Sequence, residues 1–346
     1  MADGSVTAVV VNYRSGDDLE SCLTGLLEDD GPLARVVVVD NDSEDSSWEI
    51  AKRYADDDER VEVVLSPENL GLAGAVNRVL ADVSTPYVAV LNPDVTPMTG
   101  WLRPLAASLE TDATAAVACP LVLIEESGMV NSAGQHIHLT GLGFNRLLYS
   151  APEDAGTATH RVGGLHGAAF VIRTDVLRTL GGWDDSGFLY HEDVALSWDV
   201  LLLGRDILCV PVSRVLHDYH LTMYPEKMFL LERNRIALLF SHLSTARLAI
   251  VFPALVVTEI MVWGLAILRG WRFLQAKTRA YLEVWRRRGQ IRQRKAVVRS
   301  RPVYDPRNLR RNVRWSYPVG QLGALGSERG ESKRRPPGGL PVEPSA

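Results

Sequence analysis

Asp94 follows a short apolar run, where an acid could bind a ligand at the tip of a strand. Residues 87–91, YVAVL, are rich in β-formers and predict a strand buried on both faces. Pro93 cannot donate to a strand ladder and holds Asn92 extended, so the strand ends there. A carboxylate at that point is a natural oxygen ligand for Mg²⁺ or Mn²⁺ carrying a diphosphate. The alternative is that Asp94 only caps the turn or helix that follows.

Asp40 repeats this pattern at the end of another apolar run. It follows the predicted strand 35–39, and Asn69 and Gly71 lie at the next predicted strand tip. An ionised carboxylate only accepts hydrogen bonds, so Asp40 could recognise N–H or O–H groups of a nucleotide base or ribose. Gly71 could let the backbone approach a ligand closely. For Asp40, the alternative is a cap or turn before the helix that begins at Ser46.

Glu192 and Asp193 are adjacent acids at the start of the predicted helix 193–203. Neighbouring helical residues point about 100° apart, so only one of them can serve an acceptor hydroxyl as general base. We assign that role to Asp193 and leave acceptor or structural hydrogen bonds to Glu192. His217 ends a short predicted strand, where a neutral imidazole could complete the coordination of a metal held by Asp94. The alternatives are a favourable interaction of both acids with the helix dipole and a structural His217.

Strands and helices alternate around these residues. Strands are predicted at 6–11, 35–39, 61–65, 87–91, 115–123, 168–173, 207–210 and 214–217, and the early helices at 17–27, 46–54, 73–83 and 101–109. This alternation is typical of βαβ units and predicts an α/β fold with a mostly parallel, doubly wound sheet. Ligands bind outside the carboxyl ends of strands in such sheets, so Asp40 and Asp94 are expected to face one crevice. The long segment 125–158 predicts a hairpin or a mobile flap over the site.

The C-terminal third changes character. Residues 248–268 are apolar and long enough to cross a bilayer, and a basic helix is predicted for 272–301. Pro253 and Glu259 oppose a spanning helix, since a carboxylate at the bilayer centre costs about 2.5–3.5 kcal/mol. A helix embedded in or lying on the membrane is favoured over a buried packing helix, with the basic helix on anionic headgroups. Nucleic-acid binding is disfavoured because no recognised motif accompanies the charge.

The composition is that of an ordinary globular protein. The chain has 346 residues, of which 46% are hydrophobic and 23% charged, and its net charge is −5. Its 3 cysteines are widely spaced and odd in number, which indicates reduced, structural thiols in a cytosolic compartment. Asp3 stands in place of a basic leader, so no signal peptide is evident. Four histidines are interpreted as structural: His136, His138, His160 and His166.

Five motifs, taken in order, resemble the family-two inverting glycosyltransferases of the GT-A fold. They are VVVNYRSGDDLESCLTGLL, VVVVDNDSEDSS, NLGLAGAVNRVL, YVAVLNPDV and GAAFVIRTDVLRTLGGWDDSGFLYHEDVALSWDVLLLG followed by His217, and they cover about residues 5–235. The LNPD version is most similar to the rhamnosyltransferase-like branch that acts in bacterial polysaccharide or cell-wall assembly. The resemblance implies a GT-A (Rossmann-like) sheet flanked by helices.

The resemblance also implies a role for each candidate residue. Asp40 would contact the nucleotide base, and Asp94 would bind the metal and sugar diphosphate as the last acid of a DxD motif. Asp193 would be the base of an ED motif beside Glu192, and His217 would be a metal ligand. Asn92 stands where many members carry the first Asp of the motif. The implied nucleotide-sugar-binding residues are Asn12, Asp40, Asn69, Gly71, Asn92 and Asp94.

We therefore expect a catalytic domain at 1–235, a helical membrane-associated region at 236–315 and a disordered tail at 316–346. The expected activity is metal-dependent, inverting transfer from dTDP-rhamnose or a UDP-sugar to a lipid-linked or other saccharide acceptor. Its expected place is the cytoplasmic face of the cell membrane, with Mg²⁺ or Mn²⁺ as cofactor. The alternatives are a sugar nucleotidyltransferase and a non-catalytic nucleotide-sugar-binding or scaffold protein. A dehydrogenase is disfavoured because no G-x-G-x-x-G follows the first strand.

Overall fold

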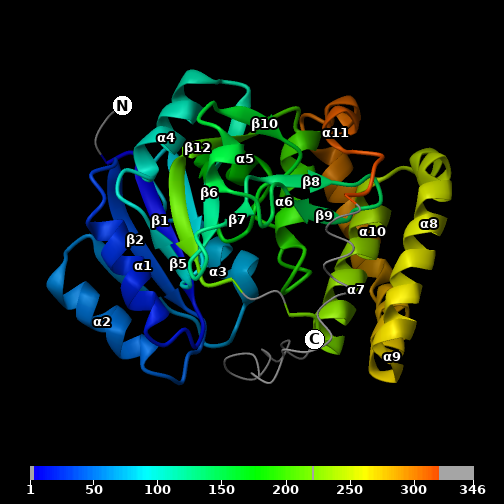
Figure 1. The fold of residues 1–346 in the computed structure, drawn as a ribbon, viewed down its shortest axis with the longest axis horizontal. Helices are drawn as coiled ribbons and strands as arrows, with labels where there is room; N and C mark the ends of the chain where they lie inside the picture. Colours follow the sequence, from blue (N-terminus) through cyan, green and yellow to red (C-terminus); the bar gives the residue numbers. More distant parts are fainter. Residues whose placement is uncertain (1–3, 220–221, 319–346) are drawn as a thin grey trace.

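The computed structural model describes residues 4–219 and 222–318 and is built on one large β-sheet (Figure 1). The strands are β1 Val6–Asn12, β2 Leu33–Asp40, β3 Val61–Leu65, β4 Tyr87–Leu91, β5 Val95–Pro97, β6 Ala115–Ile124, β7 Val130–Ser132, β8 Gln135–Ile137, β9 Gly143–Asn145, β10 His160–Val162, β11 Ala169–Arg173 and β12 Asp206–His217. The helices are α1 Asp18–Leu27, α2 Ser47–Asp57, α3 Gly71–Leu80, α4 Leu102–Thr111, α5 Thr174–Thr179, α6 Glu192–Leu202, α7 Pro225–His242, α8 Thr245–Arg269, α9 Trp271–Arg286, α10 Arg288–Ser300 and α11 Pro306–Asn312, with a 3₁₀ turn at Pro152–Ala155.

The sheet is mixed: it has the parallel pairing that the βαβ pattern predicts among β1 to β4 and between β6 and β12, and antiparallel pairing elsewhere. Its order is β10-β12-β6-β11-β4-β1-β2-β3, with β5 beside β12 and β7 beside β6. Strands β1 to β4 pair in parallel, whereas β11 runs antiparallel to both β4 and β6. The Asn92 N–H donates to Ala168 O at 2.9 Å, so β11 starts at the edge where β4 ends and must run back. The two predicted pieces at 207–210 and 214–217 form the single strand β12, which is irregular between them.

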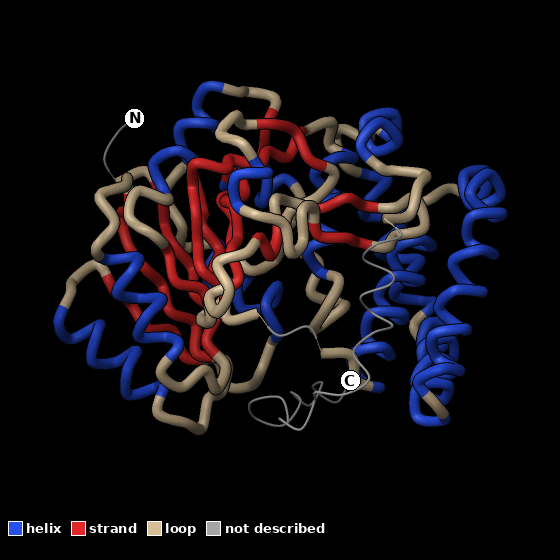
Figure 2. Tube along the Cα trace, in the orientation of Figure 1, coloured by secondary structure: helices blue, strands red, loops and turns tan. Residues whose placement is uncertain are grey.

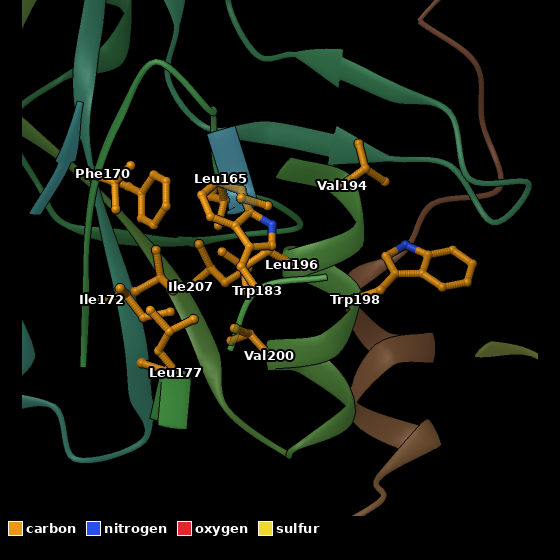
Figure 3. Close-up of a cluster of buried hydrophobic side chains, with 14 of the residues drawn as sticks. Leu165, Phe170, Ile172, Leu177, Trp183, Val194, Leu196, Trp198, Val200 and Ile207 are labelled. Atoms are coloured by element: carbon orange, nitrogen blue, oxygen red, sulfur yellow. The ribbon is translucent and has the colours of Figure 1, made fainter. Parts of the chain in front are cut away.

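Helices cover both faces of the sheet, as the buried strands require (Figure 2). Alternate residues of β1 divide between two cores: Val9 packs on the face with α3, α5 and α6, and Val10 on the face with α1, α2 and α4. Figure 3 shows part of the first core, where the rings of Phe170 and Trp183 meet edge to face at 5.5 Å. Successive strand side chains point to opposite faces, which explains why these strands are apolar throughout. The cysteines are buried and free, as predicted.

The segment 125–158 contains the predicted hairpin, made by β8 and β9, but it is not an open flap. Asn131, His138 and Thr140 are buried. The Thr258 hydroxyl of α8 donates to Thr140 Oγ1 at 3.0 Å, which attaches the turn after β8 to the C-terminal helices. These contacts hold β8 and the turn that follows it against the body of the protein.

The C-terminal helices pack on the body that contains the sheet. The predicted domain boundary at residue 235 falls inside α7, and α7 packs against α9 and α10. The predicted basic helix is two helices, α9 and α10, separated at Arg287. Helices α8 and α9 form the side of the molecule opposite α2 (Figure 1). From residue 319 on, the predicted disordered tail lies outside the described residues.

Candidate active site

Asn12 and Asp40 meet at the carboxyl ends of β1 and β2, where the strand register pairs them. Asn12 Nδ2 donates to Asp40 Oδ2 at 3.1 Å and to Ser47 Oγ at 2.8 Å, and the Ser43 N–H donates to Asp40 Oδ1 at 2.8 Å. The buried Asp40 carboxylate therefore holds its own turn, as the capping alternative required. It also lines a pocket of about 530 Å³ with Trp48 and Arg78, which is large enough for a small ligand group.

Asp94 and His217 come together because β5 begins directly after Asp94 and pairs Val95 with His217. Asp94 Oδ2 lies 3.5 Å from His217 Nε2, and among the described residues Asp94 Oδ1 is buried without a hydrogen-bond partner. His217 Nδ1 lies 2.9 Å from Asn131 Oδ1. With Nδ1 facing Asn131, Nε2 is the ring nitrogen that faces Asp94 and is placed to ligate a metal. The two side chains thus present an oxygen and a nitrogen to one point.

This pair fits a divalent metal ion that is shared with a diphosphate. Within residues 4–219 and 222–318, no three His, Cys, Asp or Glu side chains gather as a complete metal site. A Mg²⁺ ion bound beside a substrate phosphate usually takes only one or two protein ligands, so two are sufficient here. Burial raises the pKa of nearby Asp18, and the charges of Asp94, Asp218 and Glu125 raise it further. That concentration of negative charge favours a cation at Asp94.

Glu192 and Asp193 begin α6, and their surroundings give them different protonation. Burial raises the pKa of both acids, and for Glu192 the charge of Asp193 adds to the effect and brings it to about 8. Asp193 accepts hydrogen bonds from Gln135 Nε2 at 2.7 Å and from the Val194 N–H at 2.8 Å, which favour its ionised form. In the described structure Glu192 Oε2 has no such partner. The negative charge of the pair therefore belongs on Asp193, as a general base requires.

The loop before α6 is held in an unusual backbone conformation. Phe188, Tyr190 and His191 have φ of 59°, 63° and 72°, in the left-handed region that such residues rarely adopt. Asn234 of α7 donates to Leu189 O at 3.0 Å and to Tyr190 O at 2.7 Å. Backbone in this region costs about 1–3 kcal/mol per residue and persists only where its surroundings fix it. Helix α7 is therefore part of what positions the two acids.

Asn69 and Gly71 pack against this loop in the structure. Asn69 Oδ1 accepts from the Gly71 N–H at 2.8 Å, and Gly71 has φ of 69°. A Cβ added to Gly71 would lie 2.1 Å from Phe188 O, so no other residue fits. The close backbone approach expected at Gly71 is therefore made here by the protein's own loop. Asn92 is half-buried at the tip of β4.

The short loop 166–168 joins the parts of the site. The His166 ring lies 5.9 Å from the His217 ring, and a Cβ on Gly167 would lie 3.4 Å from Asp193 Cβ. The hydrogen bond from the Asn92 N–H to Ala168 O connects this loop to the tip of β4. Asp94, His217 and Asp193 thus surround one loop, and Asp40 lies on the same edge of the sheet, one strand beyond β1.

The sequence did not predict the residues that contact Asp193 and His217 from neighbouring loops. Gln135 and Asn131 come from the segment 125–158, predicted as a hairpin or a mobile flap, where their amides give no spacing pattern that points to Asp193 or His217. His166 was interpreted as structural, yet its ring packs against His217. Burial lowers the pKa of His166 to about 3, and the neighbouring His217 contributes, so this imidazole is neutral. The only available signal was its position directly before the GAAFVIR motif.

Comparison with known proteins identifies the family. The glycosyl transferase family 2 profile matches residues 7–181. The pre-mycofactocin glycosyltransferase of Mycobacterium tuberculosis is 30% identical over 217 residues, which are 62% of this chain and 43% of that protein. The N-acetylglucosaminyl-diphospho-decaprenol L-rhamnosyltransferase of the same organism is 30% identical over 233 residues, 60% of this chain and 74% of that protein. This chain thus spans less than half the length of the first relative.

A solved structure shares the fold. GalNAc-T7, crystallised with UDP, GalNAc and Mn²⁺, aligns with a TM-score of 0.58 and 19% identity over 68% of this chain and 48% of its own. At that identity the likeness concerns the fold alone. The profile match includes Asn12, Asp40 and Asp94 and spans half of the chain. This chain belongs to glycosyl transferase family 2.

Proposed function

We propose that this chain is a metal-dependent, inverting glycosyltransferase with a nucleotide-sugar donor and a lipid-linked saccharide acceptor. The observation that carries the proposal is the convergence of the Asp94–His217 pair and Asp193 on one loop at the sheet edge. Family membership supports the reaction class. The name of the decaprenol-linked rhamnosyltransferase relative supports a rhamnose donor and a lipid-linked acceptor as the first classes to test. We propose dTDP-rhamnose or a UDP-sugar as the donor.

The donor would lie along the carboxyl edge of the sheet. Asp40 and Trp48 line a pocket that would receive the base, since the carboxylate accepts from its N–H groups and the indole offers a stacking surface. Asn92 would contact the ribose with its amide, and Asp94 would hold the diphosphate end. A Mg²⁺ or Mn²⁺ ion held by Asp94 and His217 would supply positive charge beside the departing nucleoside diphosphate.

Asp193 would carry the proton transfer. Its carboxylate accepts the proton of the acceptor hydroxyl as that oxygen forms a bond to the anomeric carbon. The bond from that carbon to the diphosphate oxygen breaks on the opposite face, and its electron pair leaves with the nucleoside diphosphate. One displacement inverts the anomeric centre. Protonated Glu192 is able to donate a hydrogen bond to the acceptor.

The acceptor class places the reaction at a membrane, and we propose the cytoplasmic face. Helix α8, Thr245–Arg269, is long and apolar enough to cross a bilayer, with a mean hydropathy of 2.2 in its most apolar window. Only 17% of that window is buried within the protein. A single helix of this kind is weak support, and the relative's lipid-linked substrate adds to it.

A donor screen tests the function. The purified full chain is incubated with Mn²⁺ or Mg²⁺, a bacterial lipid extract, and dTDP-rhamnose, UDP-sugars or GDP-mannose in turn, and nucleoside diphosphate release is measured. We expect one donor to give release that requires both metal and extract and is lost in Asp193→Asn. Equal release by Asp193→Asn would refute the assignment of the base. Binding of a donor without any turnover would favour a scaffold protein instead.

A further inference from the structure

We propose that α8 and α9 dock on an anionic lipid bilayer with α8 lying in the membrane plane. This inference refines the membrane location in the proposed function, but its geometry comes from the two helices alone. We define the lipid face as a set of exposed apolar side chains of the pair: Ile250, Val257, Ile260 and Ile267 of α8, and Trp271 and Trp285 of α9.

A continuous stripe of large aliphatic side chains runs along the outer side of α8. The four α8 residues of the lipid face are 46% to 68% exposed. Their spacings of seven, three and seven residues put them on one side of the helix. At a rise of 1.5 Å per residue, the stripe extends about 25 Å along the helix. It is therefore a continuous apolar surface and not a set of isolated exposed residues. Exposed apolar surface of this extent marks a contact with a protein or a membrane.

The opposite side of α8 is fixed to the body of the protein. Glu259 Oε1 accepts from Arg235 Nη2 of α7 at 2.6 Å, and Glu259 Oε2 lies 2.8 Å from Lys277 Nζ of α9. Arg235 and Lys277 are buried, and Glu232 of α7 pairs with both. Buried Thr258 adds its hydrogen bond to Thr140. The middle of α8 is therefore attached by charge pairs and by a hydroxyl pair.

These attachments decide how α8 can meet a bilayer. A spanning helix would have to leave α7 and α9, carry Glu259 to the bilayer centre, and leave Arg235 and Lys277 with one partner fewer. Removing one member of a buried ion pair is strongly unfavourable because the remaining charges stay buried. With the fold intact, only the lipid face is available, so α8 lies parallel to the surface with one side in the acyl boundary.

Charge and aromatic residues at the start of α9 favour an anionic bilayer as the partner of the lipid face. Trp271 is 70% exposed, and its indole suits the interface between headgroups and acyl chains. Trp271, Arg272 and Arg279 line a hollow of about 490 Å³ between the starts of α7 and α9, together with a single acid, Glu226 of α7. Both guanidinium groups are suited to a lipid phosphate.

Vesicle flotation tests the docking. We expect the full chain to float with phosphatidylglycerol vesicles and to bind phosphatidylcholine vesicles more weakly. The double variant Ile260→Asp/Ile267→Asp is expected to bind the vesicles at least about tenfold more weakly, since each change removes an aliphatic side chain that would be buried in the bilayer. Val212→Asp, which alters an exposed apolar residue of β12, is the matched control and should bind normally. Arg272→Glu/Arg279→Glu should remove the preference for the anionic lipid.

Tag accessibility tests the orientation. With a cleavable tag at each end of the chain, inside-out membrane vesicles from expressing cells should lose both tags to added protease. Cleavage of one tag with protection of the other would show a spanning helix and overturn the in-plane geometry. A dimer that Ile260→Asp dissociates, with no vesicle binding, would show that a second copy covers this face. Neither measurement uses sugar transfer, so either outcome leaves the test of the proposed reaction independent.

Discussion

Replacing Glu192 with Gln should stabilise the protein at neutral pH, although the residue lies in the site. The side chain is half-buried, and its Oε2 atom finds no partner in the structure described. Burial, with the charge of Asp193, raises its pKa from 4.5 to about 8. Gln has nearly the same shape and cannot ionise, so it avoids the cost of keeping an acid at this position.

The sign and size of the stability change follow from the pKa of Glu192 in the unfolded chain, 4.5, and in the folded protein, about 8. Because the folded value is the higher one, folded Glu192 retains a proton that the unfolded chain has released between pH 4.5 and about 8. Its contribution to stability is complete below pH 4.5 and is lost as the pH rises through about 8. At 1.36 kcal/mol per pKa unit, the loss at pH 7 has an upper bound of about 3 kcal/mol. Partial solvent exposure reduces the expected gain to about 1–2 kcal/mol, or a few degrees in Tm.

Thermal unfolding of the wild type and Glu192→Gln at pH 4 and pH 7 measures this effect. The variant should be more stable at pH 7, and the difference should disappear near pH 4. Glu126→Gln, at an exposed acid, is the control and should change neither value. An equal gain at both pH values, or a loss at pH 7, would show that Glu192 does not carry a raised pKa.

Three further predictions concern the site and the helical attachment. Asp193→Asn should lower kcat about 10²–10⁴-fold with little change in donor KM, measured as nucleoside diphosphate release; a fall in donor affinity alone would contradict the base assignment. His217→Ala should raise the Mn²⁺ concentration for half-maximal activity about 10–100-fold, whereas His160→Ala should not, and equal effects would exclude a metal ligand at His217. Glu232→Gln should destabilise the fold by about 3 kcal/mol in denaturant unfolding, because two buried cations lose a partner. Burial opposes ionisation of Glu232, but Arg235 and Lys277 lower its pKa to about 2. The contribution of Glu232 to folding stability should therefore be complete above pH 4.5 and lost as the pH falls through about 2. A stability difference between the wild type and Glu232→Gln that does not change with pH would contradict this.

The strand tips were predictable because two local rules agree there. An apolar run identifies a buried strand, and a proline or polar break ends it, so Asp40 and Asp94 could be placed at tips from sequence. The parallel register then brings the tips to one edge, as β1 does with β2 and β4. The return of β11 along β4 was not predictable in this way, because a strand's direction leaves no mark on its apolar pattern.

Side-chain partners across the fold could not be predicted. In the sequence, Glu259 only interrupts an apolar helix. Its partners Arg235 and Lys277 belong to other helices, and the periodicity of α8 does not indicate them. The contact of Gln135 with Asp193 joins residues 58 positions apart and depends on how the β8–β9 hairpin packs against α6. Local pattern indicated which residues are polar at the site, and tertiary packing determined which of them touch.

Helix α7 connects the proposed lipid face to the proposed base, and neighbouring residues of this helix make both connections. Asn234 holds the loop that leads into α6, while Arg235 binds Glu259 of α8 and donates to Thr140 O at 3.2 Å. Gly141 O, the next carbonyl, lies 2.7 Å from His191 Nε2. With α8 in the membrane plane, the height of Asp193 above the bilayer is therefore set by packed helices. In this proposal, a lipid-linked acceptor would be selected by the distance from its lipid to its sugar as well as by the sugar itself. The proposed base could not move toward a shorter or longer acceptor without breaking this set of buried contacts.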